Sequence, residues 1–301
     1  MHKTYKDGGF FMIRKAVFPV AGMGTRFLPA TKASPKEMLP LVDRPLIQYV
    51  VEEVLESGVK YMIFVTGRNK RPIEDYFDAS WELESILKDQ DKSSLLADVD
   101  KIRDDAEFIY VRQPKPLGLG HAVLMSSAVI DNEPFAVVLG DDIISSEIPA
   151  MKQLISVYER YHSPVLALER VPEEEVSSYG IAVAKPIPDD DGVFKIVDLV
   201  EKPEIHESPS NYAVIGRYIL VPEIFDILKE TKPGRGGEIQ LTDALRTLCE
   251  RRLVLGVEVK GKRYDCGSKI GYLKATVDFA LQHPEFKDDM KKHLKEICVD
   301  L

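Results

Sequence analysis

The chain has 301 residues, of which 45% are hydrophobic and 30% charged, and its formal net charge at pH 7 is −9. This composition is typical of a globular protein, and the length allows one large domain or two ordinary ones. The negative charge disfavours nucleic acid and anionic membranes as partners, and no apolar run approaches the length needed to span a bilayer.

Residues 1–11 are predicted to be a disordered extension, and residues 12–301 a single domain. In the first half of that domain, short apolar runs alternate with amphipathic segments, a pattern that favours a parallel α/β sheet. The predicted strands of this half are residues 15–21, 61–67, 107–113 and 135–142, the last ending in two acids. The predicted helices are residues 45–58, a charged region beginning at 82–88, and 121–130.

The pattern changes after Pro149. A predicted helix to about Tyr161 precedes four strand candidates with little helix between them, at residues 164–171, 180–186, 193–203 and 211–220. Helices are predicted at 237–252 and in the segment from Ile270 to Val299. The expected fold is α/β, with a Rossmann-like mixed, mostly parallel sheet flanked by helices, an antiparallel extension and C-terminal helices. Three widely spaced cysteines predict free thiols in a reducing cytoplasm.

A candidate ligand loop, AGMGTRF, directly follows the first predicted strand. Gly22 and Gly24 match half of a dinucleotide fingerprint, but Phe27 replaces its third glycine, and the chain has no Walker-type sequence. Glycines after a strand let backbone N–H groups surround an anion, and Arg26 adds a planar cation suited to phosphate. A tight strand-to-loop turn explains these residues equally well.

Two lysine–glutamate pairs are further candidates. Lys36 could neutralise phosphate while Glu37 accepts hydrogen bonds from a base, or the two could form a charged surface turn. Glu201 could hold sugar hydroxyls and Lys202 a phosphate, or both could be a solvated strand end.

Carboxylates follow two predicted strands. Asp141 and Asp142 end the strand 135–142, and Asp265 follows another short strand. Ligands of open α/β sheets bind outside the carboxyl ends of the strands, so Asp141 and Asp265 are candidates for a magnesium site completed by phosphate oxygens. Acids at strand ends also occur as simple loop caps.

Gln113 precedes a turn, and Gly118 and Gly120 precede a helix whose first backbone N–H groups could donate to a ligand. A plain helix entry is the alternative. His121 has no partner in the sequence and is expected to be a packed or solvated histidine. The segment 232–243, rich in glycine, is expected to be mostly structural.

Together these segments resemble the bacterial UTP–glucose-1-phosphate uridylyltransferases (UDP-glucose pyrophosphorylases), a branch of the sugar-1-phosphate nucleotidylyltransferase family. The resemblance rests on AGMGTRFLPATKASPKEMLP, PLGLGHAV, LGDD, YGI, VEKP, GGEIQLTDAL and YDCGSKIGY, in that order. It extends from about Arg14 to the C-terminal helices.

The resemblance implies specific site residues. It implies nucleotide contacts at Ala21, Gly22, Gly24, Thr25, Arg26, Lys36, Glu37, Gln113 and Gly118. Sugar-phosphate contacts are implied at Gly180, Glu201 and Lys202, and Mg²⁺ held by Asp141 and Asp265. The residues expected to act in catalysis are Arg26, Lys36, Asp141 and Lys202. A homo-oligomer, dimer or tetramer, is also implied, with the helices of 270–301 as the expected interface.

The implied reaction converts UTP and glucose 1-phosphate into UDP-glucose and pyrophosphate, by in-line attack of the sugar phosphate on the α-phosphorus of UTP. The attacking phosphate is already ionised at neutral pH, so no general base is required. Positioning and charge neutralisation should therefore provide most of the catalysis. We expect Mg²⁺ to bridge the α-phosphate and the attacking phosphate, Lys202 to hold the sugar phosphate, and Arg26 and Lys36 to stabilise pyrophosphate.

Base selection is not decided by Gln113 alone, because a side-chain amide that can flip cannot reject CTP. We expect the Gly118 N–H to face a uracil carbonyl, and some use of dTTP, because one methyl group changes binding by only about 1–3 kcal/mol. The alternatives are an enzyme for another nucleotide or sugar 1-phosphate, a NAD-dependent dehydrogenase, and a nucleotide-sugar sensor without turnover. The missing third glycine disfavours the dehydrogenase.

Overall fold

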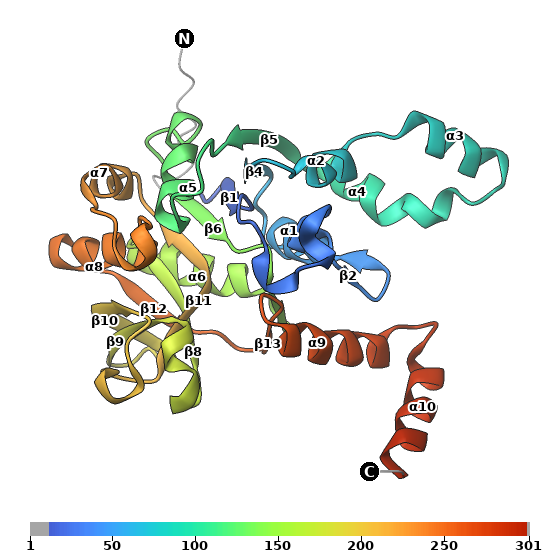
Figure 1. Cartoon of the computed structure of the whole chain (residues 1–301). Helices are drawn as coiled ribbons and strands as arrows, with labels where there is room; N and C mark the ends of the chain where they lie inside the picture. Colours follow the sequence, from blue (N-terminus) through green and yellow to red (C-terminus); the bar gives the residue numbers. More distant parts are fainter. Residues whose placement is uncertain (1–11, 300–301) are drawn as a thin grey trace.

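The computed structural model describes residues 12–299, apart from the side chains of Arg235 and Val299. The extension expected over residues 1–11 lies outside this range. Within it, nine strands form one mixed sheet that is covered by helices on both faces (Figure 1). In their order across the sheet, the strands are β5 (Glu107–Arg112), β4 (Tyr61–Thr66), β1 (Lys15–Pro19), β6 (Phe135–Val138), β11 (Tyr212–Leu220), β8 (Val165–Arg170), β12 (Leu255–Glu258), β10 (Val193–Glu201) and β9 (Gly180–Pro186).

The sheet has two parts with different pairing. Strands β5, β4, β1 and β6 are parallel neighbours. From β6 onward most pairings are antiparallel, with β12 and β8 parallel. The predicted α/β class, with a parallel first part and an antiparallel extension, is therefore confirmed.

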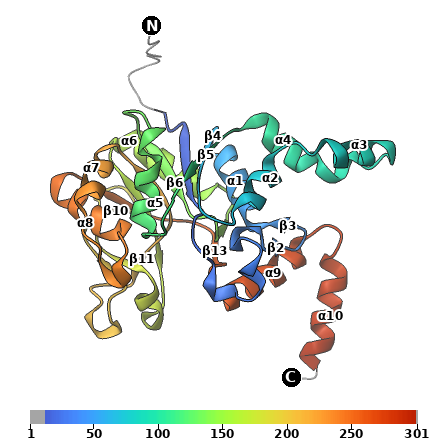
Figure 2. The same ribbon diagram turned by 45° about the horizontal axis from the view of Figure 1, so that its top comes forward.

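The helices cover both faces of this sheet. They are α1 (Leu46–Glu56), α2 (Arg71–Phe77), α3 (Trp81–Asp89), α4 (Ala97–Asp105), α5 (Leu119–Met125), α6 (Ala150–Tyr161), α7 (Glu223–Glu230), α8 (Leu241–Arg251), α9 (Lys269–Gln282) and α10 (Lys287–Val299). The arm of α3 and α4 and the helix α10 project from the same side of the molecule (Figures 1 and 2). Among the described helices, none is long and apolar enough to cross a bilayer.

Two hydrophobic clusters pack against the two faces of the sheet. Along β1, Ala16 and Phe18 belong to one cluster and Val17 to the other, because successive side chains of a strand point to opposite faces. Helices α1 and α6 contribute to the first cluster, and α5, α7 and α8 to the second. Since both faces are buried, the strands are nearly continuous apolar runs, which is why most of them were predictable.

The prediction that Asp141 and Asp142 end one strand is wrong. Strand β6 ends at Val138, Asp141 lies in a turn, and Asp142 begins another strand, β7 (Asp142–Ser145). This strand pairs with β13 (Lys262–Asp265) in a separate two-stranded ribbon, and β2 (Pro40–Leu41) pairs with β3 (Arg44–Pro45) in a second one.

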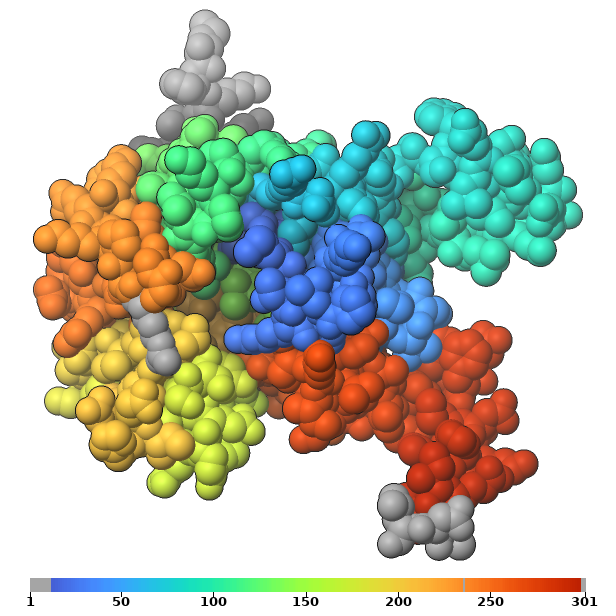
Figure 3. Space-filling view, viewed as in Figure 1, coloured from blue at the N-terminus to red at the C-terminus, as the bar shows by residue number. Residues whose placement is uncertain are grey.

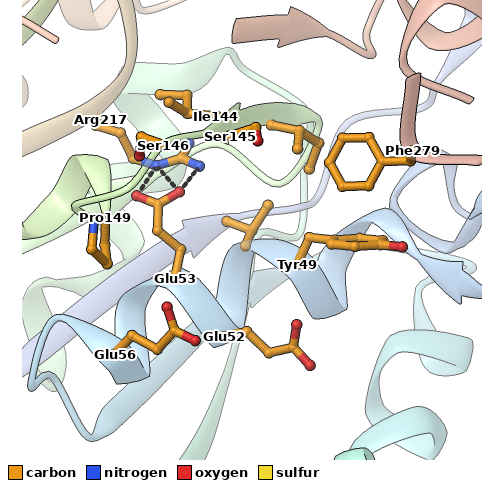
Figure 4. A pocket seen from close by; sticks show the side chains of 12 residues that line it. Tyr49, Glu52, Glu53, Glu56, Ile144, Ser145, Ser146, Pro149, Arg217 and Phe279 are labelled. Carbon is orange, nitrogen blue, oxygen red and sulfur yellow. Dashed lines mark hydrogen bonds and ion pairs between the residues drawn. The ribbon is translucent and has the colours of Figure 1, made fainter. Parts of the chain in front are cut away.

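A buried arginine explains why the chain turns there. Arg217 of β11 is 0% exposed and donates hydrogen bonds to the carbonyl oxygens of Leu139 (3.4 Å) and Asp142 (2.8 Å). Its charge is balanced by Glu53 of α1, with 2.6 Å between Nη2 and Oε2 (Figure 4). The pair lines a small cavity of about 180 Å³ between α1 and β7.

Other boundaries also differ from the sequence prediction. Helix α7, helix α2 and strand β12 were not predicted, and the helix predicted over 121–130 ends at Met125 before a short 3₁₀ turn. The helix predicted over 237–252 begins only at Leu241, because residues 238–240 pack in extended conformation against the start of α5.

Candidate active site

The candidate residues of the first half lie in loops at one edge of the sheet. Strands β1, β4, β5 and β6 are parallel, so the segments that follow them meet at the same edge. These segments begin near Ala21, Gly67, Gln113 and Leu139. A Cβ atom on Gly67 would lie 3.0 Å from the carbonyl oxygen of Ala21, which shows how closely the first two loops approach. This edge is where ligands bind in open α/β sheets.

The two glycines of the first loop have different environments. Gly24 has φ +64°, its carbonyl accepts from Thr31 Oγ1 at 2.7 Å, and an added Cβ would lie 3.3 Å from Lys36 Cβ. The turn therefore requires a glycine at position 24. A Cβ on Gly22 would meet nothing within 4 Å, so the space beside its backbone is open to a ligand.

Lys36 and Arg26 both face the acidic part of the site. Lys36 Nζ lies 2.5 Å from Asp141 Oδ2. Burial alone would raise the pKa of Asp141, but the Lys36 ammonium outweighs burial and lowers it. Arg26 Nη1 donates to the carbonyl oxygen of Gly267 at 3.5 Å. Two cations from the first loops thus lie against two acidic segments from the rest of the chain.

The ribbon of β7 and β13 brings Asp141 and Asp265 together. In this ribbon Asp265 is paired with Asp142. A Cβ on Gly267 would lie 2.7 Å from Asp141 Oδ2 and 3.0 Å from Asp265 Oδ1, so the two carboxylates converge on this glycine. The Gly267 N–H and the hydroxyl of Tyr179 each donate to Asp265, at 3.0 and 3.2 Å.

The carboxylates of Asp141 and Asp265 fit magnesium as ligands. In residues 12–299, no group of three or more His, Cys, Asp or Glu side chains is arranged to hold a metal. Asp141 and Asp265 offer only hard oxygen ligands, and Mg²⁺ is usually held by one or two carboxylates together with substrate phosphates and water. The other acid of the turn, Asp142, is buried and bound to Arg263 (2.6 Å) and the Gly216 N–H (2.8 Å), which makes its role structural.

Gln113 lies buried at the end of β5, and its side chain is held by two acceptors. Its Nε2 lies 3.1 Å from the Gly118 carbonyl oxygen and 2.9 Å from His121 Nδ1. Burial lowers the pKa of His121. His121 therefore has a partner that its position in the sequence did not reveal.

The start of α5 is fixed by the segment 238–240. The Ile239 N–H donates to the Leu117 carbonyl at 2.8 Å, and the Gly120 N–H donates to the Ile239 carbonyl at 2.9 Å. The Gly120 N–H is therefore bonded within the protein, which agrees with the alternative of a plain helix entry at this glycine. Gly118 has φ +102°, and a Cβ there would lie 2.7 Å from Glu238 Cβ. Both glycines permit this close approach.

The sugar-phosphate candidates adjoin one another at the ends of β9 and β10. Glu201 Oε1 lies 2.8 Å from Lys202 Nζ, and Glu201 Oε2 accepts from Thr242 Oγ1 at 2.7 Å. A Cβ on Gly180 would lie 2.8 Å from the same hydroxyl. Thr242 lies in the first turn of α8, whose N-cap residue is Gln240, and its hydroxyl donates to Glu201.

Glu37 is the candidate with the least open surroundings. Its side chain is 1% exposed and its Oε2 lies 2.8 Å from Nζ of Lys70, which is itself buried. The contact holds the SPKEMLP segment against the loop after β4. A nucleoside contact by Glu37 stays a prediction.

Several residues at the site were missed from the sequence: Lys70, His121, Tyr179 and Thr242. Three of them lie in motifs that contributed to the resemblance, which was the available signal: His121 in PLGLGHAV, Tyr179 in YGI and Thr242 in GGEIQLTDAL. The backbone of Tyr179 also accepts from the Lys202 N–H at 2.9 Å, which joins the sugar-phosphate candidates to the carboxylates.

The contacts run around the site as a ring. From Asp141 they pass through Lys36 and the first loop to the end of β4 and Gln113. They continue through Gly118 and the segment that leads to Thr242 to Glu201, and through Tyr179 back to Asp265. In the space-filling view the surface is hollowed between the blue N-terminal loops and the orange segment before α8 (Figure 3).

The chain is similar to known proteins over most of its length. A family model described as nucleotidyl transferase matches residues 15–281. The chain is similar to UTP–glucose-1-phosphate uridylyltransferase of Streptococcus pneumoniae, with 50% identity over 293 residues that cover 96% of this chain and 97% of the relative.

Two solved structures are similar in fold over most of the chain. A UDP-glucose pyrophosphorylase complexed with UDP-glucose gives a TM-score of 0.85 at 50% identity, covering 90% of this chain and 100% of the other. A UTP-bound UGPase from Acinetobacter baumannii gives a TM-score of 0.87 at 42% identity, covering 95% and 99%. The names of these two structures include a nucleotide sugar, UDP-glucose, and a nucleoside triphosphate, UTP.

Proposed function

The chain belongs to the nucleotidyl transferase family, among its UTP–glucose-1-phosphate uridylyltransferases, and we propose that it converts UTP and α-D-glucose 1-phosphate into UDP-glucose and pyrophosphate. The observation that supports this most is the convergence of Asp141 and Asp265 at Gly267, with Lys36 and Arg26 beside them. Two polyanionic substrates have to meet in one place, and this arrangement offers charge of both signs there.

The proposed step is a displacement at phosphorus. A phosphate oxygen of glucose 1-phosphate attacks the α-phosphorus of UTP, the bond to the bridging oxygen breaks, and pyrophosphate leaves in line. No proton has to be removed from the nucleophile. The protein therefore acts by orienting both phosphates and offsetting their charge.

We assign the orientation of the substrates and the offsetting of their charge to individual residues. We assign the sugar phosphate to Lys202, the glucose hydroxyls to Glu201, and the leaving pyrophosphate to Arg26 and Lys36. Glu201 is held by Thr242 as well as by Lys202, so its carboxylate is oriented before substrate binds.

Magnesium would be held by Asp141 and Asp265, where it would supply charge neutralisation to the α-phosphate and the attacking phosphate. Tyr179 and the Gly267 N–H orient Asp265, and Lys36 orients Asp141, so both ligands have fixed positions.

The test is pyrophosphate release from UTP and glucose 1-phosphate, with Mg²⁺ and with EDTA. We expect turnover only with Mg²⁺. Asp141→Asn, Asp265→Asn and Lys202→Ala should each lose about 10²–10³ in kcat, the size of effect seen when one electrostatic contact is removed. Asp226→Asn is the matched control, because Asp226 is exposed on α7 and pairs with Lys229. Near-normal rates in the three site variants would contradict the assignment.

We further propose that the chain self-associates in the cytoplasm through α9 and α10. Apolar side chains are exposed on and between these helices, namely Ile270, Leu273, Phe286 and Ile297. The three cysteines are free thiols, as a reducing compartment favours. Sedimentation equilibrium measures the oligomeric state of the wild type and of the double variant Ile270→Ser/Leu273→Ser, and we expect the double variant to self-associate less. A wild type that stays monomeric at micromolar concentration would contradict the interface.

A further inference from the structure

The side-chain amide of Gln113 is bound on its nitrogen side by two acceptors. Nε2 carries two hydrogens, and two acceptor atoms lie within hydrogen-bond distance: Gly118 O at 3.1 Å and His121 Nδ1 at 2.9 Å. An amide nitrogen only donates, so His121 Nδ1 has to accept, which places the ring proton on Nε2. Both hydrogens of the amide are thus used within the protein.

The Gly118 carbonyl cannot turn away from this contact. It also accepts the Ala122 N–H at 3.1 Å in the first turn of α5. The backbone at Gly118 is in turn fixed by the segment 238–240, whose atoms lie against it. The direction of this acceptor is therefore set by the fold.

A flipped amide would be strongly disfavoured. Its Oε1 would face the Gly118 carbonyl oxygen, which has no hydrogen to donate, and two acceptors repel each other at the 3.1 Å that separates the Gln113 and Gly118 atoms. Burial lowers the pKa of His121, which keeps its ring neutral at neutral pH, and the neutral tautomer with its proton on Nε2 leaves Nδ1 to accept the second amide hydrogen. The free group of Gln113 is therefore its oxygen.

We propose that His121 is a positioning residue that fixes the Gln113 amide, so that Gln113 presents only an acceptor to N3 of a pyrimidine. Uracil and thymine carry a hydrogen on N3 and can donate to this oxygen. Cytosine has a lone pair on N3 and would be repelled. The identity of the ligand as a pyrimidine nucleotide rests on the proposed function.

The proposal resolves a question that Gln113 alone leaves open. A freely rotating glutamine can serve uracil in one orientation and cytosine in the other. With its nitrogen held by Gly118 and His121, the same side chain discriminates between the two bases. Thymine, with the same N3–H, is not rejected by this contact.

The test compares two nearly isosteric substitutions. His121→Asn keeps an acceptor, Oδ1, close to the position of Nδ1, whereas His121→Leu removes it. The ratio of kcat/KM for UTP over CTP should fall about 3- to 10-fold in H121L, the effect of one neutral hydrogen bond, and stay within about twofold of wild type in H121N. The ratio of UTP over dTTP should be unchanged in both variants.

These ratios separate positioning from a merely structural role. A loss of folded enzyme lowers the rates for UTP and CTP equally and leaves their ratio unchanged. In a Gln113→Ala background, H121L should change the UTP/CTP ratio no further, because His121 acts through Gln113. A UTP/CTP ratio in H121L within twofold of wild type, or an equal fall in H121N, would overturn the proposal.

Dissociation constants of UTP and CTP, measured by calorimetry without glucose 1-phosphate, give the same ratios independently of turnover. Preferential binding of UTP without transfer to glucose 1-phosphate would contradict the proposed function and leave the test of His121 intact. A wild type that binds both nucleotides equally would overturn the inference itself.

Discussion

Replacing Arg217 by methionine should destabilise the protein strongly. The Arg217 guanidinium is fully buried and lies within 2.6 Å of the Glu53 carboxylate, which has only a small exposed fraction. Without Arg217, Glu53 is left inside the core, where within residues 12–299 the Met151 N–H still donates to it at 2.9 Å. Breaking a buried ion pair from one side costs about 3–5 kcal/mol. That is a large share of the total stability of a typical domain, about 5–15 kcal/mol.

The double variant Glu53→Gln/Arg217→Met is the decisive control. The Glu53→Gln change keeps an acceptor for the Met151 N–H and removes the uncompensated charge, so we expect the double variant to be more stable than Arg217→Met by about 2 kcal/mol or more. Urea unfolding followed by circular dichroism at pH 7 measures the free energy of unfolding of wild type, both single variants and the double variant.

The same variants report on the active site. Arg217 also binds the carbonyls of Leu139 and Asp142, on either side of Asp141, so its loss should lower turnover even in molecules that remain folded. The reasoning is refuted if Arg217→Met lies within about 1 kcal/mol of wild type, or if the double variant is less stable than the single one.

Further predictions concern single positions. Gly118→Ala should lower the free energy of unfolding by about 2 kcal/mol or more, because φ is +102° and the Cβ would collide with the segment 238–240. Gly22→Ala, in open space, should change it by less than about 0.5 kcal/mol while raising KM for UTP; thermal unfolding and kinetics compare the two, and equal destabilisation would contradict us. Thr242→Val removes a hydrogen-bond donor to the Glu201 carboxylate, so it should raise KM for glucose 1-phosphate about tenfold and leave KM for UTP within about twofold of the wild-type value. Equal changes in the two KM values would argue against this role. Burial lowers the pKa of His121 below 6.5, so the unfolded chain binds a proton more readily and stability should fall as the pH drops below about 6.5. His121→Asn should flatten this dependence in urea titrations at pH 7.5 and 5, and an unchanged slope would contradict it.

The elements that were predictable from the sequence are the long ones with uniform burial. Strands β1, β4 and β11 are apolar along most of their length, apart from Lys15 and Arg217, because both faces of the sheet are covered. The missed strands β7 and β12 have only four residues each, too few to show a repeating pattern of apolar and polar side chains. Helix α7 follows Leu220 almost directly, so no polar loop separates its pattern from that of β11.

For the site, sequence identified residue types at strand ends but not their orientation. The proximity of Asp141 and Asp265 depends on the ribbon of β7 and β13, which no local pattern encodes. The partner of Gln113 was missed for a similar reason. The direction of the Gly118 carbonyl depends on residues 238–240, more than a hundred positions away, and only the folded chain brings them together.

The segment 238–240 also has a thermodynamic consequence. Its backbone at Ile239 is bonded to the start of α5, beside the proposed base contact, and three residues later Thr242 holds Glu201 at the proposed sugar contact. A ligand that displaced this backbone at one end would change the affinity for a ligand at the other. Linkage requires the reverse effect to have the same magnitude, so nucleotide and sugar phosphate would bind cooperatively through a few residues that connect their two ends of the site.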